Sequence, residues 1–196
     1  IPSAAFTQPP PLRFEHLSDA YGLSHNRVWA ITQDKYGLIW IGTNDGLNRF
    51  DGYEMDVFRN EPGNKNSLPD NFIRCLFTDS RGEVWIGTAN GLAHYDSRTN
   101  SFHSFFPDST DENSLPGNNI SAIKEDAYGI LWIGTNSGLC SFDKKNKRFQ
   151  RFLDDDRSNT ISNNFIRDIE FAPDGSMWIS TGRGLNRLDL STMRFT

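Results

Sequence analysis

A repeat of 45–47 residues constrains the fold of this 196-residue chain more than any other feature of its sequence. The repeat is marked by four tryptophans separated by 45, 47 and 46 residues: Trp40, Trp85, Trp132 and Trp178. Aligned on them, seven columns are identical in all four units, and in the first unit these are Gly37, Trp40, Ile41, Thr43, Gly46, Leu47 and Asp51. Periods of about 40–50 residues are typical of propellers, solenoids and other repeat arrays.

Each unit contains four short runs with strand character and shows no helical periodicity. In the first unit these runs are 27–33, 38–42, 47–50 and 54–58, joined by turns rich in Gly, Asn and Asp. Such residues supply the positive φ angles that tight hairpins require. Four antiparallel strands per unit describe a propeller blade. We therefore predict an all-β fold, a β-propeller with four four-stranded blades.

The invariant columns are predicted to build the scaffold. The tryptophan fills the space between adjacent blades, the glycine serves backbone geometry, and the threonine and aspartate close turns through side chain to backbone hydrogen bonds. These positions are therefore poor candidates for a ligand site. They comprise Trp40, Trp85, Trp132, Trp178, Gly46, Gly91, Gly138, Gly184, Asp51, Asp96, Asp143 and Asp189.

The spacing also predicts an incomplete ring. We expect blade units at about residues 23–67, 68–114, 115–160 and 161–196. Phe14 lies 26 residues before Trp40, the spacing at which a fourth strand precedes the Trp of the next unit, so Phe14–Leu17 within residues 12–22 is predicted to be an orphan outer strand. Another fourth strand begins at residues 193–196, which would give four blades five outer strands. We expect a partial, open section of a larger propeller; closure of four blades and dimerisation into an eight-bladed ring are the alternatives.

Composition narrows the function classes. The formal charge of −5 argues against a nucleic-acid partner, and no apolar run approaches the ~18 residues of a membrane helix. Cys75 and Cys140 fall at different phases of the repeat, so free thiols are predicted rather than a disulfide. The small, polar, Pro-rich residues 1–11 are typical of a processed or flexible N-terminal segment.

No pattern of residues predicts catalysis, a metal site or a cofactor. The four histidines fall at four different phases of the repeat, without metal-ligand spacing: His16, His25, His94 and His103. Nucleophile-elbow, Walker and dinucleotide-binding motifs do not occur.

The predicted binding region is one mouth of the central channel, where the turn between the second and third strands meets the linker to the next blade. Variable loops on a rigid scaffold carry function more often than the scaffold itself. Planar polar and aromatic side chains there would suit a sugar, and Trp29 is the one tryptophan outside the repeat phase. The alternative for each candidate is packing between blades or local pairing. The candidates are Arg27, Trp29, Asn44, Asp45, Phe72, Arg74, Asn90, Asn136, Arg167 and Arg183.

The repeated string also points to a family. In the first unit it is Asp34-x-x-Gly37-x-x-Trp40-Ile41-Gly42-Thr43-x-x-Gly46-Leu47-x-x-Phe50-Asp51, and it resembles the two-component regulator propeller repeat. The resemblance covers about residues 12–196. The fourth unit departs most from the pattern, with Ser180, Ala172 and Leu188 in the columns of Gly42, Asp34 and Phe50.

The resemblance implies a function that periodicity does not. Such repeats fill the periplasmic sensor regions of hybrid two-component systems, notably in Bacteroidota, usually as two seven-bladed propellers followed by a β-sandwich, a membrane helix and a kinase. By resemblance, the chain is an N-terminal part of a ligand-sensing periplasmic ectodomain and an open section of a seven-bladed propeller. The implied ligand is an oligosaccharide whose detection regulates glycan-utilisation genes. The implied partners are the remaining blades, the downstream sensor domains and a second copy in a homodimer.

Two other classes remain open. A propeller lectin or protein-interaction module would lack a signalling output. A propeller lyase or hydrolase would need a cluster of histidine, tyrosine or glutamate at the channel mouth.

Overall fold

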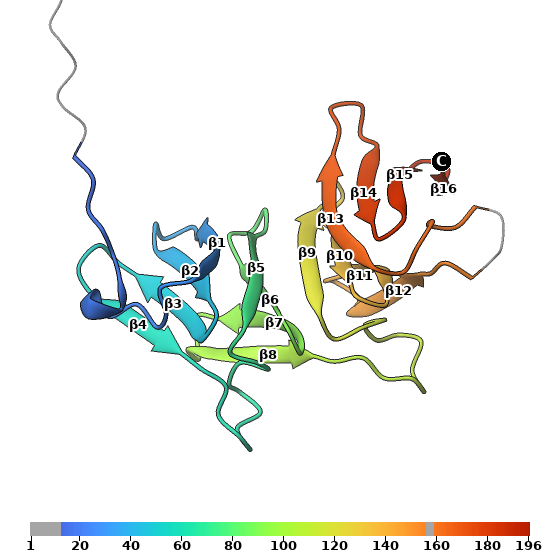
Figure 1. Ribbon diagram of the computed structural model, residues 1–196. Helices are drawn as coiled ribbons and strands as arrows, with labels where there is room; N and C mark the ends of the chain where they lie inside the picture. Colours follow the sequence, from blue (N-terminus) through green and yellow to red (C-terminus); the bar gives the residue numbers. More distant parts are fainter. Residues whose placement is uncertain (1–12, 156–158) are drawn as a thin grey trace, which may run out of the picture.

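Alternating strand patterns and glycine turns give the chain four antiparallel sheets of four strands each, which confirms the predicted all-β propeller blades. The computed structural model in Figure 1 describes residues 13–155 and 159–196. Blade 1 contains β1 (Val28–Gln33), β2 (Ile39–Thr43), β3 (Gly46–Phe50) and β4 (Met55–Phe58). Blade 2 contains β5 (Ile73–Thr78), β6 (Val84–Thr88), β7 (Gly91–Asp96) and β8 (Ser101–Phe105).

The third and fourth blades repeat this order. Blade 3 contains β9 (Ile120–Glu125), β10 (Leu131–Thr135), β11 (Gly138–Asp143) and β12 (Arg148–Phe152). Blade 4 contains β13 (Ile166–Phe171), β14 (Met177–Thr181), β15 (Gly184–Asp189) and β16 (Arg194–Phe195). The inner strands β1, β5, β9 and β13 contact one another in series. Figure 1 shows the blades in chain order along an open arc, with blade 1 and blade 4 at its two ends.

Each blade junction is built on an isoleucine that packs against a glycine of the preceding blade. A Cβ on Gly134 would lie 2.6 Å from Cγ2 of Ile166, and the same approach joins Gly42 to Ile73 and Gly87 to Ile120. These isoleucines are fully buried. The glycine column therefore permits close packing, because any side chain there would occupy the space of the next inner strand.

The repeat tryptophans of blades 1 to 3 lie in the same junctions. Trp40 packs against Tyr95 of blade 2, with ring centroids 4.7 Å apart, and its Nε1 donates to Asp34 Oδ2 at 2.9 Å. Trp85 and Trp132 make the equivalent hydrogen bonds to Asp79 and Asp126. In blade 4 the aspartate column holds Ala172.

Threonine and aspartate side chains close the turns. Thr43 Oγ1 donates to the carbonyl of Gly46 at 3.0 Å and accepts from the amide of Asp45. The carboxylate of Asp51 accepts two backbone amides beyond β3. Corresponding bonds recur in the other three blades, so the invariant columns are engaged in local geometry.

The predicted orphan strand is not formed. Residues 13–18 have no strand structure, Phe14 is 91% exposed, and a short 3₁₀ helix, η1 (Asp19–Tyr21), follows. The physical reason is that a strand requires a ladder partner for its backbone groups, and no described strand pairs with this segment. The N-terminal segment predicted at residues 1–11 lies outside the described residues, as does residue 12.

Candidate functional site

Every inner strand carries a β-bulge at the same position of the repeat. In β1, Val28 pairs with Thr43 and Ala30 with Gly42, so Trp29 is left unpaired between them. The same skip leaves Arg74, Ser121 and Arg167 unpaired in β5, β9 and β13. Bulges re-aim side chains and are common next to functional sites. These four residues, which we call the bulge column, mark the mouth-side end of the inner strands.

Three members of the bulge column line one cleft. The cleft has a volume of about 140 Å³ and spans the inner strands of blades 2, 3 and 4. It is lined by Arg74, Asn119, Ser121, Asn136, Phe165, Ile166 and Arg167, a set that contains two cations and no carboxylate. Because all of these residues come from three consecutive blades of this chain, the cleft needs no further blade to form.

The two arginines of the cleft are held by aromatic rings rather than by acids. The guanidinium of Arg74 lies 5.7 Å from the ring centroid of Phe72, and that of Arg167 lies 5.3 Å from that of Phe165. Arg74 Nε is buried without a hydrogen-bond partner. A buried donor without an acceptor costs about 1–3 kcal/mol, so this atom marks a place where a ligand oxygen would be stabilised.

A second cluster lies beside the cleft, at the mouth-side end of blades 1 and 2. Trp29 Nε1 donates to Asn44 Oδ1 at 2.6 Å, its ring lies 5.4 Å from that of Phe72, and Arg27 stacks on it at 4.6 Å. Trp29 is nevertheless 45% exposed. A fixed, exposed indole offers a flat apolar surface with polar neighbours, which suits the C–H face of a sugar ring.

The remaining predicted residues are placed differently. Asp45 pairs with Arg59 at 3.3 Å and accepts from Asn71, and Asn90 accepts from Asn118 at 3.2 Å. Both therefore join a turn to a linker. Arg183 is exposed in its turn in blade 4.

The structure brings Trp29, Asn44 and Phe72 together with Arg27, and places Arg74, Asn136 and Arg167 around the cleft. The sequence interpretation missed Asn119 and Ser121 as lining residues. The signal for Ser121 was available, because it occupies the same repeat column as Trp29, Arg74 and Arg167.

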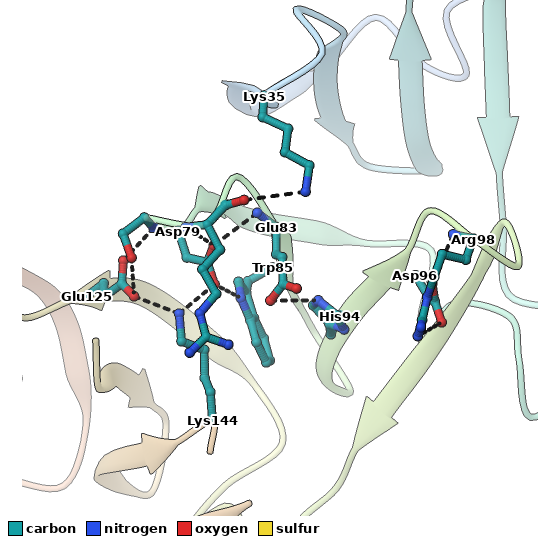
Figure 2. A network of polar contacts seen from close by, with 11 residues as sticks. Lys35, Asp79, Glu83, Trp85, His94, Asp96, Arg98, Glu125 and Lys144 are labelled. Atoms are coloured by element: carbon teal, nitrogen blue, oxygen red, sulfur yellow. Dashed lines mark hydrogen bonds and ion pairs between the residues drawn. The ribbon is translucent and has the colours of Figure 1, made fainter. Parts of the chain in front are cut away.

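The opposite ends of the inner strands carry a network of charged and polar side chains (Figure 2). Figure 2 shows Lys144 of blade 3 between Asp79 and Glu125, and its Nζ lies 2.6 Å from a carboxylate oxygen of each. Asp79 also accepts from Trp85 Nε1. Burial raises the pKa of Asp79, but the hydrogen bonds from Lys144, the amide of Glu83 and Trp85, with the charge of Lys144, together outweigh it, and the net pKa lies below the usual value. The network joins blade 2 to blade 3.

Groups suited to catalysis are not gathered at the mouth. The described residues contain no cluster of three or more His, Cys, Asp or Glu side chains that could hold a metal ion. Cys75 and Cys140 are free thiols, and burial raises the pKa of Cys75 to about 12. That thiol is not an activated nucleophile.

Four consecutive blades of four antiparallel strands define a section of a β-propeller. The family described as two-component regulator propeller matches residues 22–45, 67–90, 114–137 and 160–183, once in each blade. The chain belongs to this family, as the repeated string predicted.

Solved relatives place the fold in receptors. The extracellular domain of a hybrid two-component system from B. thetaiotaomicron is 25% identical with a TM-score of 0.68, over 93% of this chain and 31% of that one. A second such domain from the same organism is 25% identical with a TM-score of 0.69, over 85% of this chain and 22% of that one. The chain thus spans less than a third of these relatives and corresponds to part of a propeller ectodomain of hybrid two-component systems.

Two further similarities cover a shorter segment or the fold alone. A protein named histidine kinase P4 of Formosa agariphila is 44% identical over 55 residues, which is 28% of this chain and 4% of that protein. Virginiamycin B lyase from Staphylococcus aureus shares the fold, with a TM-score of 0.64 at 16% identity over 87% of this chain and 54% of that one.

Within the described residues, no helix is long and apolar enough to span a bilayer.

Proposed function

We propose that this chain is part of the ligand-sensing ectodomain of a two-component signalling receptor and that it binds an oligosaccharide at the channel mouth. The observation that carries the proposal is the bulge column, which directs variable side chains to one cleft and includes the unpartnered Arg74 Nε. Asparagine and arginine donors suit sugar hydroxyls, and the exposed ring of Trp29 suits a sugar face.

In this proposal the ectodomain is periplasmic, and the remaining blades and downstream sensor domains complete the receptor. Ligand binding rearranges a homodimer and thereby regulates glycan-utilisation genes. The similarity to extracellular domains of hybrid two-component systems and to a histidine kinase supports the placement in a receptor with further domains.

The residues of the cleft favour binding of the saccharide without its cleavage. The lyase that shares the fold raises the alternative of a propeller enzyme. The lining of the cleft contains no histidine, tyrosine or glutamate, and these are the groups that a lyase or hydrolase would use as acid and base. Incubation with pectic and glycosaminoglycan oligomers should therefore leave them uncleaved.

The proposal is tested by calorimetric titration of the 196-residue chain with a panel of neutral and acidic oligosaccharides. We expect at least one to bind, and Trp29→Ala to weaken it about fivefold or more, because stacking on an aromatic ring contributes about 1 kcal/mol. Tyr53→Ala, which removes a 95% exposed ring near the opposite end of the blade, is the matched control. The proposal is wrong if no saccharide binds, or if both variants weaken binding equally.

A further inference from the structure

We infer that the mouth cleft selects an anionic saccharide and holds a carboxylate or sulfate group between Arg74 and Arg167. This inference rests on the proposed function and names the class of its ligand. Three observations carry it: the charge of the cleft, the aromatic contacts of the two arginines, and the buried Nε of Arg74, which has no hydrogen-bond partner.

The cleft is locally cationic in a chain that is acidic as a whole. The sequence holds 25 acidic and 20 basic residues, yet the lining of the cleft contains two arginines and no acid. Asp168 follows Arg167 in β13, but it is not among the lining residues, and within the described residues it forms no ion pair with either arginine. An anion entering the cleft therefore meets two guanidinium groups that have no acidic partner.

Several arginines elsewhere in the described chain already have acceptors. Arg49 pairs with Asp56 and Arg187 with Asp174, and Arg151 donates to carbonyls of the linker between blades 2 and 3. By contrast, within the described residues neither arginine of the cleft has a side-chain hydrogen bond or an ion pair, and their contacts are to the rings of Phe72 and Phe165. Both guanidinium groups of the cleft therefore keep their N–H groups available to a ligand.

Ring stacking leaves the useful part of each guanidinium free. A guanidinium held against an aromatic ring has no oxygen acceptor there for its N–H groups. The N–H edge then fits carboxylate or sulfate oxygens with two parallel bonds. Arg74 Nε is already buried and lacks an acceptor, so a ligand oxygen would remove an existing cost as well as add an ion pair.

The polar side chains between the arginines favour the hydroxyls that flank such a group. Asn136 Oδ1 accepts from the amide of Asn119 at 3.2 Å, which leaves its Nδ2 as a donor. Ser121 Oγ donates to the carbonyl of Ile166 at 2.8 Å, and its lone pairs remain to accept. The cleft therefore offers mainly donors, the complement of an oxygen-rich anionic sugar.

The test compares two pairs of ligands that differ at the charged group and keep the same length and linkages. One pair is an oligomer of galacturonic acid and its carboxyl-reduced galactose form; the other is a sulfated galactan oligomer and its desulfated form. We expect one charged member to bind about tenfold or more tightly than its neutral counterpart, and to weaken as salt concentration rises. Which charged oligomer binds identifies the carboxylate or the sulfate as the recognised group.

Substitutions of single arginines test whether the cleft causes the preference for the charged ligand. Arg167→Gln changes an exposed side chain and should weaken the charged ligand about tenfold while leaving the neutral one unchanged. Arg74→Gln should do the same, and Arg167→Lys should lose less because it keeps the charge. Arg98→Gln is the control, because Arg98 pairs with Asp96 in the turn after β7, away from the mouth.

Failures of the two proposals are distinguishable. If neutral oligomers bind as tightly as charged ones, or if Arg167→Gln has no effect on the charged ligand, the charge inference is overturned and saccharide binding at the mouth still stands. An equal loss in Arg98→Gln would show nonspecific attraction and would also overturn it. If no saccharide of either pair or of the wider panel binds, both proposals fall together.

Discussion

A blade face that packs against a neighbouring blade is covered, and a face without a described neighbour, in blade 1 or blade 4, is open. The same repeat columns occur on both kinds of face. The repeat leucine after the second glycine is fully buried in blades 1 to 3, whereas Leu185 of blade 4 is 61% exposed. Val28 of blade 1 is 47% exposed, although its equivalents in the other inner strands are fully buried. Trp178 is 39% exposed, while the other repeat tryptophans are buried. The neighbouring blade, and not the residue type, thus decides what a column contributes.

The comparison gives matched pairs of substitutions, in which the open face serves as control for the covered one. The largest effect is expected for the buried isoleucine of the last junction. Ile166→Ala removes a fully buried side chain that packs on Gly134 and should lower the free energy of unfolding by about 3–4 kcal/mol. Val28→Ala, in the same column on the open face, should lower it by less than about 0.5 kcal/mol. Urea denaturation followed by tryptophan fluorescence measures both, and equal losses would contradict the comparison.

The next effect concerns the charged junction between blades 2 and 3. Lys144→Met leaves two carboxylates buried, because the side chain of Asp79 is 0% and that of Glu125 7% exposed. Removing one partner of a buried ion pair costs about 3–5 kcal/mol. We expect about 3 kcal/mol here, since Asp79 keeps its hydrogen bonds from Trp85 and two backbone amides. Lys145→Met, at an exposed neighbour, is the control in the same denaturation experiment, and a loss below about 1 kcal/mol in Lys144→Met would show that the network adds little.

How far the sequence predicts this structure depends on the distance over which each feature acts. The blades and their turns follow from local columns such as Thr43 and Asp51, whose partners lie within three residues. The lysine network does not, because Lys144 reaches Asp79 across 65 positions and its column holds Ser97 and Leu190 in other blades. Such contacts depend on the way neighbouring blades are packed together.

The candidate site shows the same limit. Composition and position in the strand identify Trp29 and Arg74 as residues that the scaffold does not require. The bulge that brings Arg74, Ser121 and Arg167 to one cleft is a feature of backbone register, and one sequence does not reveal which residue of a strand is left unpaired. The predicted strand at 14–17 failed for a related reason, since a strand needs a partner that sequence pattern alone does not supply.

A smaller effect is expected at the glycine of the junction. Gly134→Val places its Cβ 2.6 Å from Cγ2 of Ile166 and should cost about 1–3 kcal/mol through overpacking. Ser180→Val, in the same column of blade 4, should change stability by less than about 0.5 kcal/mol, because no described blade packs on that face. Thermal unfolding of the two variants gives the comparison, and a stable Gly134→Val protein would mean that the junction can open without loss.

The smallest effect is a dependence of junction stability on pH, which is clearest on the alkaline side. Burial lowers the pKa of Lys144, but hydrogen bonds to Asp79 and Glu125 outweigh it and leave the pKa above its usual 10.5. The folded state therefore binds this proton more tightly than the unfolded state does. Its contribution is fully present below pH 10.5 and is lost as pH rises through the higher folded-state pKa.

Other groups also act in this range, so the effect must be read as a difference between proteins. Burial raises the pKa of Tyr95 in the junction of blades 1 and 2. The unfolded state therefore loses the tyrosine proton at a lower pH than the folded state, and this also lowers the stability of the fold as pH rises. Lys144→Met removes the lysine and leaves Tyr95 unchanged, so the loss in urea midpoint from pH 9 to pH 11.5, roughly spanning the ordinary lysine pKa, should be smaller in the variant than in the wild type. Lys145→Met should keep the wild-type slope. Parallel slopes in all three proteins would show that the proton on Lys144 is held no more tightly in the folded chain than in the unfolded one.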